Sequence, residues 1–208
     1  MTKKDIIKEL DVIFEVYKNI IIDEVIKNDG LTYKFALLTS VLNRSNAIIE
    51  GYKKVLSTNN IIVLNSLIRM QIDNCIFVYG LYLLNNDGHK SKDLFLNIVK
   101  SNKKLSEYKI EKNKLYDTYI VEQINNEYKN KFLEAYNFYC RFIHFSDGAI
   151  TSSMYSKENN VLELELVKEY SRFKPYIITN SITFIEVCKF LVILIKNKWT
   201  NLDDEVFS

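Results

Sequence analysis

The chain has 208 residues, of which 48% are hydrophobic and 26% are charged, with a formal net charge of +2. This composition is ordinary for a globular protein, and the small net charge excludes the strong overall field of a polyanionic or polycationic chain. One proline and five glycines interrupt the chain so rarely that long helices are favoured.

Apolar residues recur at helical spacing along most of the chain, and capping residues or glycines mark several boundaries. We expect helices at residues 5–27, 33–56, 60–84, 92–106, 119–145 and 175–198, with a charged break at 107–118. Between 149 and 167 the spacing changes to a period of two, which predicts a β-hairpin. No repeat or linker divides the chain. The sequence therefore predicts a single all-α domain over residues 1–208, a bundle of about five to six long helices with one small hairpin.

The cysteines and the apolar segments predict a cytoplasmic protein. The three cysteines lie far apart, without a metal-ligand pattern, and each falls in an apolar helix where cysteine acts as a small buried side chain. The first ten residues carry charges where a signal peptide needs apolar residues. Residues 177–195 form the most apolar stretch, but Glu186 and Lys189 make it a poor membrane span. We expect no cofactor, no metal ion and no membrane association.

The third predicted helix carries a polar stripe in otherwise apolar surroundings. Asn65, Ser66, Arg69 and Asp73 fall on one side of it, at 100° per residue. Arg69 and Asp73 are four residues apart and can form an ion pair. A buried ion pair adds little stability over an apolar replacement, so its presence invites a functional interpretation. The alternatives are a structural pair or a stripe that faces solvent.

The fifth predicted helix carries a second polar stripe, formed by Glu134, Asn137, Arg141 and His144. Its opposite side is aromatic and includes Phe138. His144 lies near the end of the helix, where the helix dipole favours the protonated imidazole, so it can serve as a general acid or base. The alternative is a solvated stripe with a weak surface ion pair.

Facing stripes would bring Arg69, Asp73, Arg141 and His144 into one pocket, closed by the hairpin that follows. Two arginines suit a phosphate or a carboxylate, which they can bind through two parallel hydrogen bonds. A histidine beside them can transfer a proton. The sequence therefore predicts an anion-binding site at this place, provided that the two stripes face each other.

Two stretches resemble the HEPN superfamily and related bacterial all-α families: NSLIRMQID at 65–73 and YCRFIHFS at 139–146. Many HEPN proteins are metal-independent endoribonucleases of toxin–antitoxin or phage-defence systems, with an arginine and a histidine that form the site across a dimer. The resemblance implies that Arg141 binds the scissile phosphate and that His144 is the acid and base. Arg69, Asp73, Asn137 and Ser146 would then bind substrate. Two residues separate Arg141 from His144, where the family has four to six.

The resemblance implies an RNA-targeting effector of bacterial defence or stress response. It would form a homodimer, and its partners would be RNA and an antitoxin or defence protein. The alternative function is a non-catalytic helical module that binds a partner protein or a small anionic ligand through the same stripes. A lysine-rich run at 100–114 could follow an RNA backbone, but such a run is typical of a solvated surface.

Overall fold

The computed structural model describes residues 1–27, 31–143, 154–157, 161–164, 174–199 and 202. The all-α prediction with a small hairpin is confirmed. In chain order the elements are α1 (Lys3–Lys27), α2 (Tyr33–Leu56), α3 (Ile61–Asn86), α4 (Ser91–Ser101), the 3-10 helix η1 (Leu105–Glu107), β1 (Lys109–Ile110), β2 (Asn113–Lys114), α5 (Asp117–Tyr128), α6 (Phe132–Ile143), β3 (Met154–Lys157), β4 (Val161–Leu164) and α8 (Lys174–Lys198).

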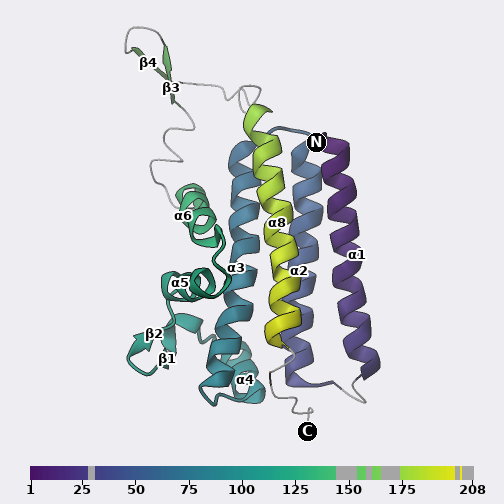
Figure 1. The fold of residues 1–208 in the computed structure, drawn as a ribbon, viewed down its shortest axis with the longest axis vertical. Coiled ribbons are helices and arrows are strands. Elements are labelled where there is room, and N and C mark those ends of the chain that lie inside the picture. The colour runs from purple at the N-terminus through teal and green to yellow at the C-terminus, as the bar shows by residue number, and fades with distance from the viewer. Residues whose placement is uncertain (28–30, 144–153, 158–160, 165–173, 200–201, 203–208) are drawn as a thin grey trace.

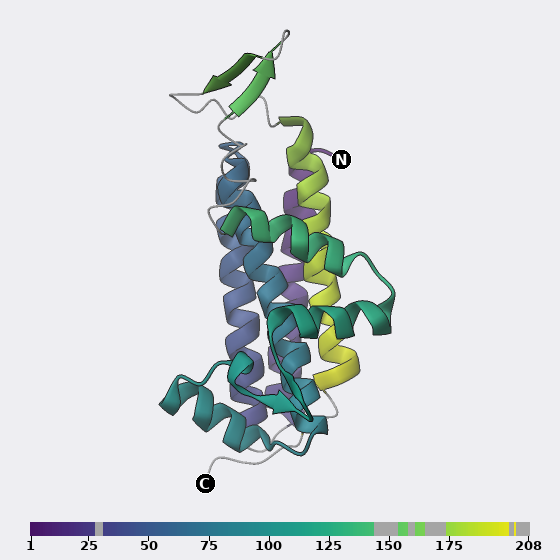
Figure 2. The same cartoon turned by 90° about the vertical axis from the view of Figure 1, so that its left-hand side faces the viewer.

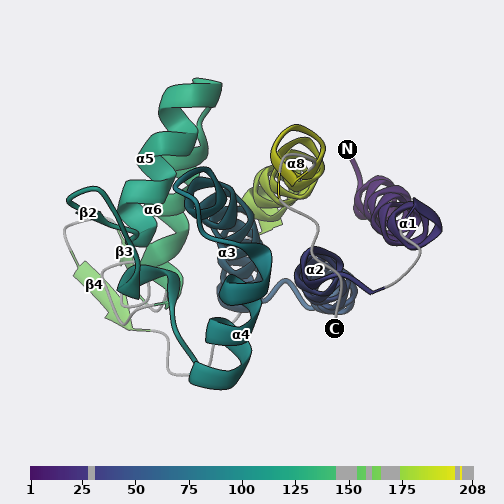
Figure 3. The ribbon, with the colours of Figure 1, turned by 90° about the horizontal axis from the view of Figure 1, so that it is seen from below.

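Four long helices, α1, α2, α3 and α8, run side by side along the molecule (Figure 1). The shorter helices α5 and α6 lie across these long helices (Figure 2). Seen from below, α5 and α6 cover the side of α3 that faces away from α1 and α2 (Figure 3). α3 therefore has neighbours on several sides, and residues on most of its surface are buried. This agrees with its apolar sequence, because a helix that is apolar all round is normally central.

Side-chain caps mark two helix starts. The hydroxyl of Thr32 accepts a hydrogen bond from the Phe35 amide at the start of α2, and the side chain of Asn60 accepts one from the Val63 amide at the start of α3. Each cap satisfies a backbone donor that has no partner within its helix. The bounds of α2 are those predicted, and α3 begins one residue later and ends two residues later than predicted.

The single helix predicted over 119–145 is wrong, because the chain forms α5 and α6 there. Lys129 adopts a left-handed backbone conformation, with φ 47°, and ends α5. The Asn130 side chain then accepts a hydrogen bond from the Phe132 amide, 3.1 Å away. The break allows Tyr128 and Phe132 both to contact Phe190 of α8, with ring centroids 5.1 and 5.2 Å apart. Packing against α8 thus accompanies a break in an otherwise helical pattern.

α4 also ends earlier than predicted, at Ser101, and Asn102 adopts the left-handed conformation. The charged break at 107–118 contains a miniature antiparallel hairpin, β1–β2. The predicted hairpin at 149–167 is present as β3–β4, in which Met154 pairs with Leu164 and Lys157 with Val161. Residues 149–153, 158–160 and 165–167 of that prediction lie outside the described residues.

Hydrogen bonds between buried side chains join the long helices. Gln71 of α3 donates to the Tyr17 hydroxyl of α1 over 3.2 Å, and that hydroxyl donates to the Cys188 carbonyl of α8 over 2.8 Å. Asn74 of α3 donates to the Ser45 hydroxyl of α2 over 2.7 Å. α3 and α8 are long and apolar enough to span a membrane, but 61% and 56% of their apolar windows are buried inside the molecule. Buried core helices of soluble proteins have the same composition.

Candidate functional site

Arg69 joins α3 to the two crossing helices. Its Nε donates to Cys140 Sγ of α6 over 3.2 Å, and its Nη2 donates to Asp117 Oδ2, at the start of α5, over 3.2 Å. Its Nη1 pairs with Asp73, so the predicted ion pair on α3 is present. The guanidinium also lies over the Tyr136 ring of α6, 4.6 Å from the centroid. Only 6% of Arg69 is exposed.

These contacts occupy both amino groups, the Nε and one face of the guanidinium. Two carboxylates already surround this one cation, so an additional phosphate would meet net negative charge. A buried arginine that is held by two carboxylates is a structural connection between helices, because its release would leave unpaired charges. The geometry therefore favours the structural alternative for Arg69 and Asp73 over an anion-binding role.

Burial raises the pKa of Tyr136 to about 12, and the neighbouring Cys140 adds to this effect while the Arg69 cation opposes it. The phenol is therefore neutral at physiological pH and presents an uncharged ring to the guanidinium. Burial also lowers the pKa of Arg44, with a further contribution from Arg69. Arg44 donates to the Met70 carbonyl over 3.2 Å and to Asn74, so it belongs to the polar network between α2 and α3.

The polar stripe predicted on the fifth helix lies on a different side of α6 from the residues that contact Arg69. Asn137 and Arg141 are exposed, whereas Tyr136 is buried and Cys140 is half-buried. Arg141 follows Cys140 by about 100° around the helix axis, and its guanidinium lies 6.0 Å from the Phe138 ring. The structure thus brings Arg69 to α6, but at Tyr136 and Cys140 and not at Arg141.

Two predicted site residues, His144 and Ser146, lie outside the described residues. Asn65, assigned to the same stripe as Arg69, instead faces α8, where its Oδ1 accepts a hydrogen bond from Asn180 over 2.7 Å. Asp117 was missed as a partner of Arg69. It is separated from Arg69 by 48 positions, and no local pattern joins the two.

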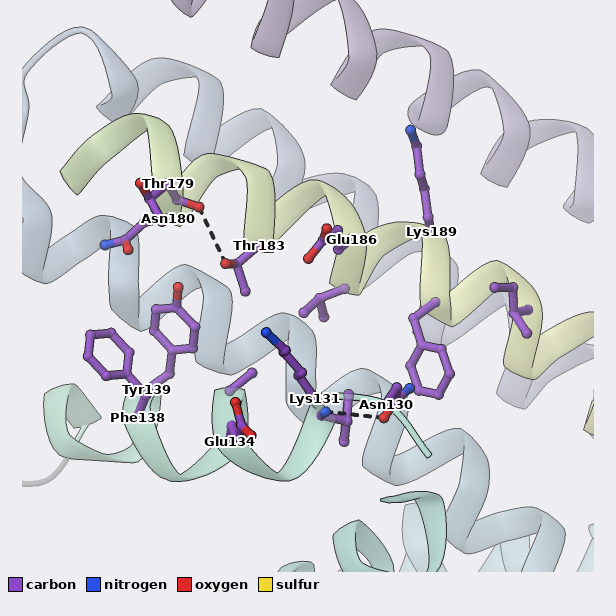
Figure 4. A pocket seen from close by; sticks show the side chains of 15 residues that line it. Asn130, Lys131, Glu134, Phe138, Tyr139, Thr179, Asn180, Thr183, Glu186 and Lys189 are labelled. Carbon is purple, nitrogen blue, oxygen red and sulfur yellow. Dashed lines mark hydrogen bonds between the residues drawn. The ribbon is translucent and has the colours of Figure 1, made fainter. Parts of the chain in front are cut away.

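A groove of about 700 Å³ lies between α6 and α8. Figure 4 shows the two helices as its walls. Its apolar lining residues are Phe132, Ala135, Phe138, Val187, Phe190 and Ile193. Phe138, on the aromatic side of the fifth predicted helix, is 42% exposed in this groove. Concave apolar surfaces of this size with a few polar groups are common binding sites.

Polar side chains line the rest of the groove, and they come from both walls. They are Asn130, Lys131, Glu134, Tyr139, Thr179, Asn180, Thr183, Glu186 and Lys189. Burial raises the pKa of Tyr139 to about 12, while its hydrogen bond with Thr183 acts in the opposite direction. The charged groups are two lysines and two glutamates, so the groove has no overall preference for anions or cations.

A second surface is strongly basic. Residues 90–114, which form α4, η1 and the β1–β2 hairpin, contain eight lysines and three acidic residues. The average lysine frequency of the chain would give about three lysines here. The exposed ones are Lys90, Lys100, Lys104, Lys109, Lys112 and Lys114. We call this region the basic lobe; it lies at the end of the bundle opposite the N-terminus (Figure 1).

The lysines of the basic lobe have no ion-pair partner among the described residues, whereas Lys18, Lys27, Lys53, Lys189 and Lys198 elsewhere each pair with a glutamate. Lys109 and Lys114 are direct partners across the β1–β2 hairpin. Like charges at opposed positions destabilise a strand pair. An anion between them would relieve this repulsion.

Within the described part of the chain, no three His, Cys, Asp or Glu side chains gather in a way that could hold a metal ion. No family model, no curated protein and no solved structure matches this chain. The resemblance to the HEPN superfamily therefore stays a prediction.

Proposed function

We propose that this protein binds single-stranded nucleic acid, with RNA as the expected ligand, through the basic lobe. The observation that carries the proposal is the group of exposed lysines without carboxylate partners among the described residues, centred on the Lys109–Lys114 pair. Lysines that meet phosphates release condensed counterions, and this release drives nucleic-acid binding.

An exposed aromatic residue beside the lysines supports a single strand as the ligand. Tyr116 is 51% exposed, and the Lys114 amine lies 5.7 Å from the centroid of its ring. Bases of a single strand can stack on such a ring, whereas bases in a duplex are already stacked on one another. The lobe thus combines cations for the backbone with an aromatic surface for a base.

The test is the binding of a fluorescently labelled single-stranded RNA, measured by anisotropy at several salt concentrations. The lobe variant is Lys109→Glu/Lys112→Glu/Lys114→Glu. We expect it to bind at least about tenfold more weakly. The slope of log binding constant against log salt concentration should be smaller in magnitude by about two, because each of the three lost phosphate contacts to a single strand contributes about 0.7 to that slope. Single-stranded DNA and duplex RNA of the same sequence serve as the comparison ligands.

The matched control is Lys4→Glu/Lys8→Glu/Lys54→Glu, which changes the total charge equally but alters exposed lysines at the opposite end of the bundle. It should keep most of the affinity and the salt slope. Equal losses in both variants would show that only the overall charge matters, and no binding by the wild type would disprove the proposal.

Cleavage of the bound RNA is a separate prediction, which rests on Arg141 and His144. Incubation of labelled RNA with the wild type, Arg141→Ala and His144→Ala, in the presence of a metal chelator, tests it directly. Products made by the wild type and lost in both variants would support a metal-independent ribonuclease. Intact RNA with preserved binding would leave a non-catalytic RNA-binding protein.

A further inference from the structure

The groove between α6 and α8 has the dimensions of a small-molecule site. Its volume of about 700 Å³ lies within the range of roughly 300–1,000 Å³ that ligand pockets occupy. Fifteen residues line it, fewer than the roughly 20–30 that each partner contributes to a stable protein interface. The groove therefore fits a compact ligand better than it fits a second protein.

Apolar and aromatic side chains give the groove a surface for an apolar molecule. Phe138 on the α6 wall is 42% exposed and Ile193 on the α8 wall is 45% exposed. The rings of Phe132, Tyr139 and Phe190 also line the groove. An apolar molecule that covers such side chains removes them from water, which is favourable, and the face of an aromatic ring attracts a cation. The lining thus suits an apolar body that carries a positive charge.

Two uncharged polar side chains of the α8 wall already have partners within the protein. Asn180 donates to Asn65 over 2.7 Å, and the Thr183 hydroxyl donates to the Thr179 carbonyl over 3.3 Å. Tyr139 keeps its proton at physiological pH, because burial raises its pKa to about 12. The charged side chains therefore decide which sign of charge a ligand should carry.

The four charged residues of the groove balance in number, but they are not equally available. Lys189 pairs with Glu9 of α1 at 2.9 Å. Lys131, Glu134 and Glu186 have no ion-pair partner among the described residues. In Figure 4 the two glutamates come from opposite walls, and the lysine reaches from the start of α6 towards α8. The available charges are one cation and two carboxylates, which leave one negative charge uncompensated.

We infer that this groove binds a small organic monocation, an ammonium group attached to an apolar body. The ammonium group compensates the excess carboxylate charge of Glu134 and Glu186, and the apolar body covers Phe138 and Ile193. An anion would meet two carboxylates against one lysine, and a neutral molecule would leave the excess charge in place. The site belongs to α6 and α8, apart from the basic lobe, so it does not depend on RNA binding.

Three probes with the same apolar body and different charges test the inference. Phenylbutylamine, phenylbutanol and phenylbutyrate are cationic, neutral and anionic at neutral pH. Each is titrated into the isotope-labelled full chain, and the amide signals in NMR spectra give the site and the dissociation constant. We expect the signals of groove residues to shift. The amine should bind about two- to fivefold more tightly than the alcohol, as a partly exposed ion pair allows, and the acid should bind most weakly.

Charge variants should change the preference for the amine over the alcohol in opposite directions. Glu134→Gln/Glu186→Gln should abolish it, whereas Lys131→Met should increase it, because this lysine opposes the charge of the ligand. The matched control is Glu122→Gln on α5, an exposed residue outside the groove, and it should keep the wild-type preference. Phe138→Ser should weaken all three probes by a similar factor, since it removes apolar surface and no charge.

Circular dichroism and thermal unfolding confirm that each variant is folded, and the single glutamine variants replace the double variant if it unfolds. The inference is overturned if no probe shifts the groove signals, a result that would leave the groove to a partner protein. It is also overturned if the alcohol or the acid binds as tightly as the amine, or if the glutamine variants keep the preference of the wild type. Either of these results would describe an apolar surface without selectivity for cations.

Discussion

Arg69 makes polar contacts with three helices, through its hydrogen bonds and ion pairs to Asp73, Asp117 and Cys140 and its position over Tyr136. Its side chain is 8% exposed, whereas those of Asp73 and Asp117 are 37% and 50% exposed. The cation is thus the buried member of the group. Its removal would leave two carboxylates beside an empty space, while the loss of one carboxylate would leave the other contacts in place.

We expect Arg69→Ala to lower the free energy of unfolding by about 2–4 kcal/mol, because it breaks a buried ion pair and removes packing. Asp117→Asn should cost less than about 1 kcal/mol, since its carboxylate is half-exposed. Urea unfolding monitored by circular dichroism measures both. Arg141→Ala is the matched control, expected within about 0.5 kcal/mol of the wild type. Equal effects of Arg69→Ala and Arg141→Ala would contradict the structural role of Arg69.

Two neighbouring elements approach α3 closely at Gly80. A Cβ atom added there would lie 2.8 Å from Leu105 of η1 and 3.1 Å from Ile120 of α5. The missing side chain therefore lets the connection after α4 and the first crossing helix pack directly on α3. Gly51 of α2 differs, because its added Cβ would meet only Leu67, at 3.9 Å.

We expect Gly80→Ala to destabilise the protein by about 1–3 kcal/mol, because the steric conflict exceeds the gain in helix propensity. Gly51→Ala should stabilise it by about 0.5–1 kcal/mol, since the methyl group fits and alanine favours the helix. The two variants make the same chemical change in two helix interiors. Thermal unfolding of both measures the difference, and a stabilising Gly80→Ala would show that η1 and α5 pack loosely on α3.

Two buried tyrosines make the stability of the fold dependent on pH in the alkaline range. Burial raises the pKa of both Tyr136 and Tyr139 to about 12, above the ordinary tyrosine value of about 10. The unfolded chain therefore loses these protons at lower pH than the folded protein does. It follows that their contribution to stability is fully present below pH 10 and is lost as the pH rises towards 12.

We expect the unfolding free energy to fall steeply between about pH 10 and pH 12. Urea unfolding at a series of pH values measures this fall, and the ultraviolet absorbance of tyrosinate follows the titration. Tyr139→Phe should make the fall shallower, because one of the shifted groups is removed. Native protein whose tyrosines all titrate near pH 10, with a flat stability profile, would contradict the expectation.

The sequence predicts helices well where interactions between residues close in the chain determine them. The apolar residues of α2 recur at helical spacing, and α3 is a long apolar segment that begins after the cap residue Asn60, so these helices were predicted almost to the residue. The pair of Arg69 and Asp73 was predicted for the same reason, because residues four apart are neighbours on a helix. The break at Lys129 was not predicted, since neither glycine nor proline marks it. The rings of Tyr128 and Phe132 beside the break contact Phe190, which lies far away in the sequence on α8.

The sequence by itself determined the helical class, most helix bounds and the hairpin, because periodicity and capping act between near neighbours. Only the tertiary structure decided what the charged residues face. It brought Asp117 and Cys140 to Arg69, left Arg141 exposed and opened the groove between α6 and α8. The physical reason is that such contacts join residues far apart in the chain, and their partners depend on how whole helices pack.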